Sequence, residues 1–213
     1  MIIGHWQLAL PADDCPMAGV RQVWHRGDMV IRPGDAADRD WIACKLAQRW
    51  GSTTIVTRGR PCDAASLPAL IAVDTTCEHG PERVGLLTYR LDREGLEVVT
   101  IDALKTGAGI GTALLSSVVR TARNAKAGRV WLITTNDNLP AISFYGRKGF
   151  RVIAVHKGAV DLARSLKPSI PLVAENGIEL HDELELELNL KADAGAWVSS
   201  ADESVALLGD DDA

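Results

Sequence analysis

The stretch LEVVTIDALKTGAGIGTALLSSVVRTARNAKAG, residues 96–128, decides the fold. Its beginning, LEVVTIDAL, is apolar and rich in β-branched residues, which predicts a strand. Glycines at every second position from Gly107 to Gly111 follow, and the apolar residues after them recur at helical spacing up to Gly128. A glycine turn between a strand and a helix exposes backbone N–H groups, and the helix dipole favours negative charge there. Such a turn is typical of a phosphate site.

Two well-known phosphate-binding turns differ from this one. A Walker turn needs a lysine after its last glycine, whereas Gly111 is followed by Thr112. A Rossmann turn has the spacing GxGxxG, whereas these glycines have the spacing GxGxG and no βαβ unit opens the chain. The spacing therefore argues against an ATPase and against a dinucleotide-binding enzyme. A tight turn that binds no ligand remains the alternative at this point.

A third kind of turn fits better. LKTGAGIGTALL resembles the acetyl-CoA pyrophosphate turn [Q/R]xxGx[G/A], with Gly109 and Gly111 in the two required positions and Thr106 in place of Gln or Arg. Downstream, TTNDNLPAISFYGRKGF resembles the segment NxxAxxFYxxxGF, with Asn138 and Tyr145 in register. The two motifs together resemble those of the GNAT superfamily of N-acetyltransferases, and the resemblance covers about residues 29–190.

The resemblance implies an α/β (α+β) fold, the GNAT fold, in which helices flank a mixed, mostly antiparallel central sheet with splayed central strands. The order of apolar runs along the chain agrees with it. Strands are predicted from Met29 and at residues 53–59, 67–74, 83–92, 129–136, 150–156 and 182–190, with helices at 35–50 and 138–149. In the last strand, glutamate alternates with leucine, which predicts a half-exposed strand.

The chain is expected to contain one domain with two appendages. Residues 1–28 form an N-terminal extension, residues 29–191 the acetyltransferase domain, and residues 192–213 an acidic tail that we expect to be disordered. The extension has three possible roles that the sequence leaves open: it covers the sheet, caps the acceptor site or joins a homodimer.

Charge and composition exclude several other functions. A net charge of -5 and a pI near 5.5, without a block of Lys and Arg, argue against nucleic acid as a partner. The four cysteines form no CxxC pair and the histidines are scattered, so we expect no metal. The N-terminus lacks the basic region of a secretory signal, and no apolar run is long enough to span a membrane. We therefore expect a cytoplasmic protein that does not bind membranes.

The resemblance also implies where acetyl-CoA binds. The strand carrying Val98–Ala103 and the strand carrying Trp131–Asn136 would splay apart around the cofactor. Its pantetheine arm would bond to the backbone at Ile101 and Ala103, and Asn138 would bind the cofactor, cap the following helix, or both. The pyrophosphate would bind the turn made by Thr106, Gly107, Ala108, Gly109, Ile110, Gly111 and Thr112.

Acetyl transfer to an amine needs two proton transfers. An amine with the pKa of lysine is only about 0.04% neutral at pH 7, so a general base, or a water leading to one, is required. Glu97 is the first candidate and Asp102 the second, with a solvated strand carboxylate as the alternative for Glu97. Tyr145 stands where the family usually keeps a tyrosine that donates a proton to the departing thiolate; the alternative is an aromatic side chain packed on the sheet.

The acceptor is predicted to be the primary amine of a small molecule. We expect its site to be built from the first helix, the loop after Trp50 and the segment Lys157–His181, where Asp161, Glu175 and Glu179 would suit a cation. Two other functions remain open: a protein or peptide N-acetyltransferase, and a CoA-binding sensor module without catalytic activity.

Overall fold

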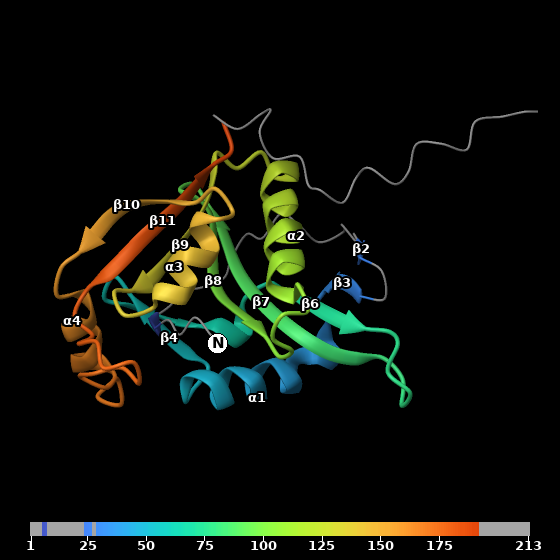
Figure 1. The fold of residues 1–213 in the computed structure, drawn as a ribbon, viewed down its shortest axis with the longest axis horizontal. Coiled ribbons are helices and arrows are strands. Elements are labelled where there is room, and N and C mark those ends of the chain that lie inside the picture. The colour runs from blue at the N-terminus through green and yellow to red at the C-terminus, as the bar shows by residue number, and fades with distance from the viewer. Residues whose placement is uncertain (1–5, 8–23, 27–28, 192–213) are drawn as a thin grey trace, which may run out of the picture.

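The computed structural model describes residues 6–7, 24–26 and 29–191. Within these residues, eight strands form the main sheet in the order β10-β11-β9-β8-β7-β6-β3-β2, and three strands form a small sheet in the order β1-β4-β5. Figure 1 shows the helices arranged around the main sheet. The mixed sheet with flanking helices confirms the predicted fold class.

The bounds of the elements are as follows. The strands are β1 (Trp6–Gln7), β2 (Trp24–Arg26), β3 (Met29–Pro33), β4 (Thr54–Thr57), β5 (Arg60–Asp63), β6 (Ala69–Asp74), β7 (Glu82–Asp92), β8 (Gly95–Ala103), β9 (Arg129–Thr135), β10 (Arg151–His156) and β11 (Glu183–Asn189). The α-helices are α1 (Arg39–Trp50), α2 (Ile110–Asn124), α3 (Leu139–Gly146) and α4 (Ala159–Leu166), and short 3-10 helices occur at Ala36–Asp38 and Ala64–Ser66.

The strands β8 and β9 form the parallel pair at the centre of the main sheet, and they separate soon after they meet. Their register contains the pairs Leu96↔Val130 and Glu97↔Trp131, although β8 continues to Ala103 and β9 to Thr135. We call Glu97 and Trp131 the vertex, and the stretches beyond them, 98–103 and 132–135, the splay. The predicted splayed central strands are therefore present.

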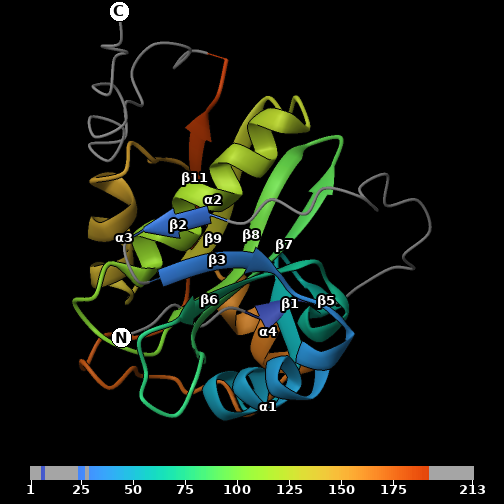
Figure 2. The ribbon, with the colours of Figure 1, turned by 90° about the vertical axis from the view of Figure 1, so that its right-hand side faces the viewer.

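The two faces of the main sheet carry different layers. Buried side chains of α2 and α3, such as Leu114, Val118 and Tyr145, form one core with the sheet. On the other face, α1 packs with β4 and the sheet, while α4 packs against β4. Figure 2 shows α2 on one side of the sheet and α1 on the other. The second face is the side on which the acceptor elements were expected.

The strand β4 lies within the strand predicted at residues 53–59, but β5, and with it the hairpin of the two strands, was not predicted. Pro61 lies inside β5, and proline in an apolar run argues against a strand because it cannot donate a ladder hydrogen bond. Here β5 lies at the edge of the small sheet, where proline is tolerated. The turn residues Arg58 and Gly59 both have positive φ, of 50° and 67°, as two-residue hairpin turns require.

The appendages are described in part. Of the extension, β1 pairs with β4 and β2 pairs with β3. The rest of residues 1–28, and the expected disordered tail at 192–213, lie outside the described residues. No helix in the described ranges has the length and apolar character needed to cross a bilayer.

Gly85 lets the start of α2 approach the sheet closely. A Cβ on this β7 residue would lie 2.5 Å from Cγ2 of Ile110 and 3.2 Å from Cβ of Ala72. Both neighbours are buried, so neither has free space to move into. Gly85 therefore sets the position of the glycine turn relative to the sheet.

Replacing Gly85 with alanine should lower the free energy of unfolding by about 1–3 kcal/mol, because it overpacks this contact. Urea denaturation measures the change. The control is Gly146→Ala at the end of α3, where an added Cβ meets no atom within 4 Å, and it should be neutral or slightly stabilising. Equal effects of the two substitutions would contradict this account.

Candidate active site

The splay leaves main-chain groups of β8 and β9 without strand partners between them. The other edge of β8 pairs with β7 along its whole length, and the other edge of β9 pairs with β11. An extended ligand that enters between β8 and β9 can therefore add strand-like hydrogen bonds. Ile101 and Ala103, the predicted backbone contacts, both lie in the splay.

The glycine turn lies at the open end of the splay, where β8 ends and α2 begins. Gly109 is the N-cap residue of α2 with a left-handed φ of 73°, and no side chain caps the helix. The first N–H groups of an α-helix have no partner within the helix. Residues 105–108 are exposed, so the turn is accessible to an anion. These features fit the pyrophosphate of acetyl-CoA, which the turn would bind through backbone N–H groups of residues 107–112.

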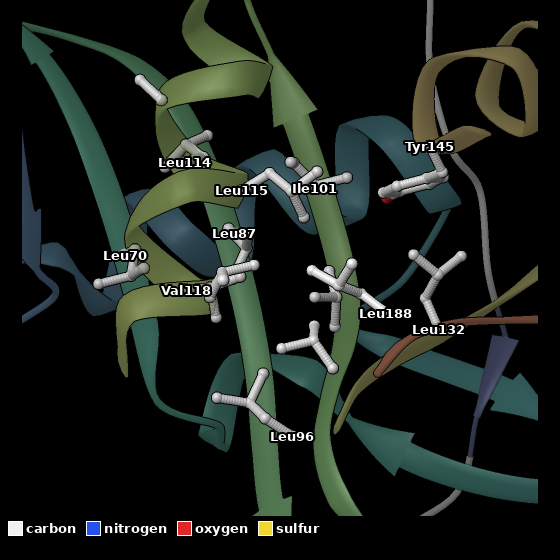
Figure 3. Packing of buried hydrophobic residues seen from close by; sticks show 14 of the residues in the cluster. Leu70, Leu87, Leu96, Ile101, Leu114, Leu115, Val118, Leu132, Tyr145 and Leu188 are labelled. Atoms are coloured by element: carbon white, nitrogen blue, oxygen red, sulfur yellow. The ribbon is translucent and has the colours of Figure 1, made fainter. Parts of the chain in front are cut away.

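Tyr145 projects from α3 toward β8, beside Ile101 in Figure 3. It is fully buried among apolar residues, and its ring packs against Phe144 and Phe150. Burial raises the pKa of Tyr145 well above its usual range, so the phenol stays protonated and can act as a donor. Tyr145 therefore has the packing role that the sequence left open as the alternative. The position of its ring toward β8 is also compatible with a catalytic role.

Asn138 caps the helix α3. Its side chain accepts a hydrogen bond of 3.4 Å from the Ala141 backbone N–H, and it is largely buried. Gly111 at the start of α2 lies opposite the same helix, since an added Cβ there would lie 3.6 Å from Cζ of Phe144. The two sequence motifs thus meet in the structure, at the open end of the splay.

Glu97 is a buried carboxylate at the vertex. It is 2% exposed, and the Arg90 guanidinium donates a hydrogen bond to it. The side chain lies on the face of the small sheet, because the charges of Arg90 and Glu97 both act on the Cys62 thiol in β5, whose pKa is raised to about 11 mainly by burial. Glu97 is therefore not the solvated strand carboxylate that the sequence left open as the alternative.

Asp102, the second candidate base, lies further along β8 toward the glycine turn. It is 8% exposed, and one carboxylate oxygen lies 4.0 Å from Nε of Arg49 in the last turn of α1. Its side chain therefore points to the same face of the sheet as Glu97. Both predicted carboxylates thus lie on the side of α1, where the acceptor is expected.

The elements that were expected to build the acceptor site come together. Nζ of Lys167, just after α4, donates hydrogen bonds to the Trp50 carbonyl at 2.8 Å and to Oγ of Ser52 at 3.0 Å. Arg164 donates to the carbonyls of the following loop, which fixes its path. The acidic residues proposed for this segment, Asp161, Glu175 and Glu179, have exposed side chains, and Asp161 pairs with Arg164. Asp161 and Glu179 both act electrostatically on the imidazole of His181, whose pKa is raised mainly by its hydrogen bond with Asp182.

The buried glutamates of β11 were missed. Glu183 and Glu185 are 1% and 6% exposed, whereas alternation with leucine predicted a solvent-facing row. The small sheet, which the sequence pattern did not reveal, lies on this face, and the Arg58 backbone N–H in its hairpin donates to Glu183 at 2.8 Å. Glu185 and Glu187 are bound by Arg129. No group of three or more potential metal ligands occurs among the residues that the structure describes.

The Lys167 ammonium should make stability depend on pH. Burial lowers its pKa to about 8 from 10.5, so between these values the unfolded chain binds more protons than the folded chain. The contribution of Lys167 to the free energy of unfolding should therefore rise with pH in this window. In urea denaturation between pH 7.5 and pH 10, Lys167→Met should lower the slope of stability against pH relative to the wild type, while Lys157→Met, at an exposed lysine, should leave it unchanged. An unchanged slope in Lys167→Met would contradict the assignment.

Comparisons with known proteins agree with this geometry. The model of the acetyltransferase (GNAT) family matches residues 46–150. The chain is 38% identical to the uncharacterised protein YdhI of Bacillus subtilis (strain 168) over 156 residues, which is 73% of this chain and 95% of YdhI.

Two solved structures show the same fold. One is a GNAT family acetyltransferase from Elizabethkingia anophelis with acetyl-CoA bound, with 20% identity, a TM-score of 0.54, and coverage of 78% of this chain and 100% of that chain. The other is Arabidopsis thaliana NAA60 in complex with acetyl-CoA, with 20% identity, a TM-score of 0.54, and coverage of 76% and 99%. The two sequence motifs, the splayed sheet and these matches agree, and the chain belongs to the GNAT family of acetyltransferases.

Proposed function

We propose that this acetyltransferase moves the acetyl group of acetyl-CoA to the primary amine of a small molecule. One observation carries the proposal: the splay runs from the glycine turn to a vertex where a buried carboxylate, Glu97, faces the acceptor side. An anion site and an amine site thus lie at the two ends of one unpaired stretch of sheet.

The donor end of the site follows from the family and from the turn. Acetyl-CoA supplies an acetyl group activated as a thioester. Backbone N–H groups of residues 107–112 would hold its pyrophosphate, and the backbone at Ile101 and Ala103 would hold its pantetheine arm. Because the phosphates bind at the open end of the splay, the thioester end of the arm must lie deeper, toward the vertex. Thr106 would contribute less than the family's Gln or Arg.

The acceptor end needs a negative charge and a proton acceptor. Glu97 is the carboxylate that we place at the acceptor amine, because it lies at the vertex. The contact with Arg90 stabilises its charged form, which suits it to attracting an ammonium group. Asp102, or a water held by either carboxylate, stays the alternative predicted from the sequence.

Tyr145 would assist the departing thiolate. Its phenol is a weaker acid than a thiol, so full transfer of its proton is unfavourable by roughly 2 kcal/mol from their ordinary pKa values alone. Burial raises the pKa of the phenol and increases that difference. We therefore propose that Tyr145 donates a hydrogen bond to the sulfur, or transfers its proton in concert with proton uptake elsewhere.

The burial of Glu97 favours a small acceptor. The side chain is 2% exposed, and the small sheet and α1 lie on its face of the main sheet. A compact amine can reach such a carboxylate more easily than the surface of a folded protein can. A peptide N-terminus or an extended lysine could still enter, so peptide acetylation is the second candidate.

Calorimetry with acetyl-CoA, followed by a screen for CoA release, tests the proposal. We expect micromolar binding, and turnover with at least one member of a panel of polyamines, aminoglycosides and amino acids that exceeds turnover with peptides. Higher activity on peptides would favour the second candidate. A folded protein that binds no acetyl-CoA would overturn the proposal.

The variant Tyr145→Phe separates an enzyme from a sensor module. It keeps the buried ring and removes the donor, so kcat should fall about 10- to 100-fold while the affinity for acetyl-CoA stays unchanged. If the protein binds acetyl-CoA but releases no CoA with any amine, it is a CoA-binding sensor module and not an enzyme.

A further inference from the structure

Glu183 is a buried carboxyl group that neither sequence motif contains. It begins β11, opposite Thr135 at the end of β9, and it is 1% exposed. A hydrogen bond from outside the main sheet holds it: the Arg58 backbone N–H, in the hairpin of the small sheet, donates to it at 2.8 Å. The carboxyl group therefore lies between the two sheets, alongside the splay.

Glu183 and Glu97 act on each other electrostatically. Burial raises the pKa of Glu183, and the negative charge of Glu97 raises it further. The positive charges that face Glu183 are His156, from β10, and Arg58, and both oppose that rise. The two carboxylates thus stand close enough to interact, but in different surroundings: Glu97 contacts a guanidinium, while Glu183 is held by a neutral amide.

Several buried side-chain groups in the described structure have no hydrogen-bond partner, and two of them matter here. They are the indole N–H of Trp131 and the hydroxyl of Thr57, in residues that are 1% and 2% exposed. Trp131 forms the vertex with Glu97, and the Arg58 side chain lies over its ring. Thr57 directly precedes Arg58 in the hairpin. An unsatisfied buried polar group is destabilising, so a polar ligand that hydrogen-bonds to both groups would be stabilised at this place.

The neighbouring glutamates of β11 differ from Glu183. Nη1 of Arg129 lies 3.1 Å from Glu185 and 2.8 Å from Glu187, and Nε2 of His156 lies 3.1 Å from Glu185. Both carboxylates are therefore neutralised by side chains of the same sheet. Among the described contacts of the glutamates on this strand, no cationic side chain donates a hydrogen bond to Glu183.

We propose that Glu183 is the general base of the acetyl transfer, that Glu97 attracts the acceptor as its ammonium form, and that Trp131 and Thr57 hydrogen-bond the acceptor near its amine. This inference rests on the proposed function and deepens it. In many active sites, two carboxylates lie in different surroundings and therefore have different proton affinities. One of them can then exchange a proton while the other stays charged. The carboxylate without a guanidinium partner accepts a proton more readily than the one that has it.

The protons balance as follows. The ammonium gives one proton to the Glu183 carboxylate and becomes a neutral amine. Its nitrogen forms a bond to the acetyl carbon as the carbon–sulfur bond breaks, and the nitrogen loses a second proton as the amide forms. The thiolate takes up one proton, and the other leaves Glu183 for the solvent, so the acceptor and acetyl-CoA yield amide, CoA and one proton.

The pH profile of Glu183→Gln tests the proposal, with the best amine from the screen as the acceptor. In the wild type, kcat/KM should fall at low pH as Glu183 becomes protonated, at a pH above the usual range of glutamate. Glu183→Gln should lower kcat at least about 100-fold and remove that acid limb, with unchanged affinity for acetyl-CoA. Glu187→Gln, on the same strand and face, should change kcat less than about threefold.

The outcomes separate this inference from the function on which it rests. A wild type that releases no CoA with any amine defeats the proposed function, whereas an active Glu183→Gln variant with its acid limb intact defeats only the role of Glu183. If Glu183→Gln does not fold, Glu183→Asp decides: the shorter carboxylate should lower kcat and keep an acid limb at a shifted pH. An unchanged rate and limb in Glu183→Asp would overturn the inference.

Discussion

The loss of pairing between β8 and β9 beyond Trp131 is the constraint on which the rest of the site depends. A sheet normally satisfies its main-chain groups along each shared edge, and here two central strands part after the pairs at Leu96 and Glu97. The separation is maintained from both faces. On one face α2 packs against the sheet, with Gly85 allowing its start to come close, and on the other face the small sheet and α1 fill the space.

Under the proposed function, the same constraint would let the two substrates meet from opposite sides of the sheet. The cofactor's phosphates need exposed N–H groups, which the start of α2 provides at the open end of the splay. The proposed acceptor would need negative charge in a site shielded from water, and the buried glutamates between the sheets would provide it. Figure 3 shows Tyr145 pointing toward Ile101. In the proposed function, the unpaired strands would connect an anion site to an amine site.

Sequence reasoning predicted the splayed strands and the two motifs beside them, but it did not predict the burial of Glu183. The glycines at 107–111 and the segment from Asn138 to Phe150 are local patterns, so they could be recognised in the sequence and meet as expected in the fold. Glu183 could not be recognised, because alternation with leucine is equally compatible with solvent on that face. Glu183 is buried by the β4–β5 hairpin, which contains Pro61. No residue pattern near Glu183 in the sequence indicates that this distant hairpin will pack against it.

Hydrogen exchange of the backbone amides, measured with and without acetyl-CoA, tests the central role of the splay most directly. The amides in 99–103 and 132–135 that face the splay should exchange faster in the free protein than those of β7 at 85–88, which is paired on both edges. Acetyl-CoA should slow them at least about tenfold. Protection should also appear at 107–112, and β6 should be unaffected. Protection confined to other regions, or equal exchange in the two states, would contradict the account.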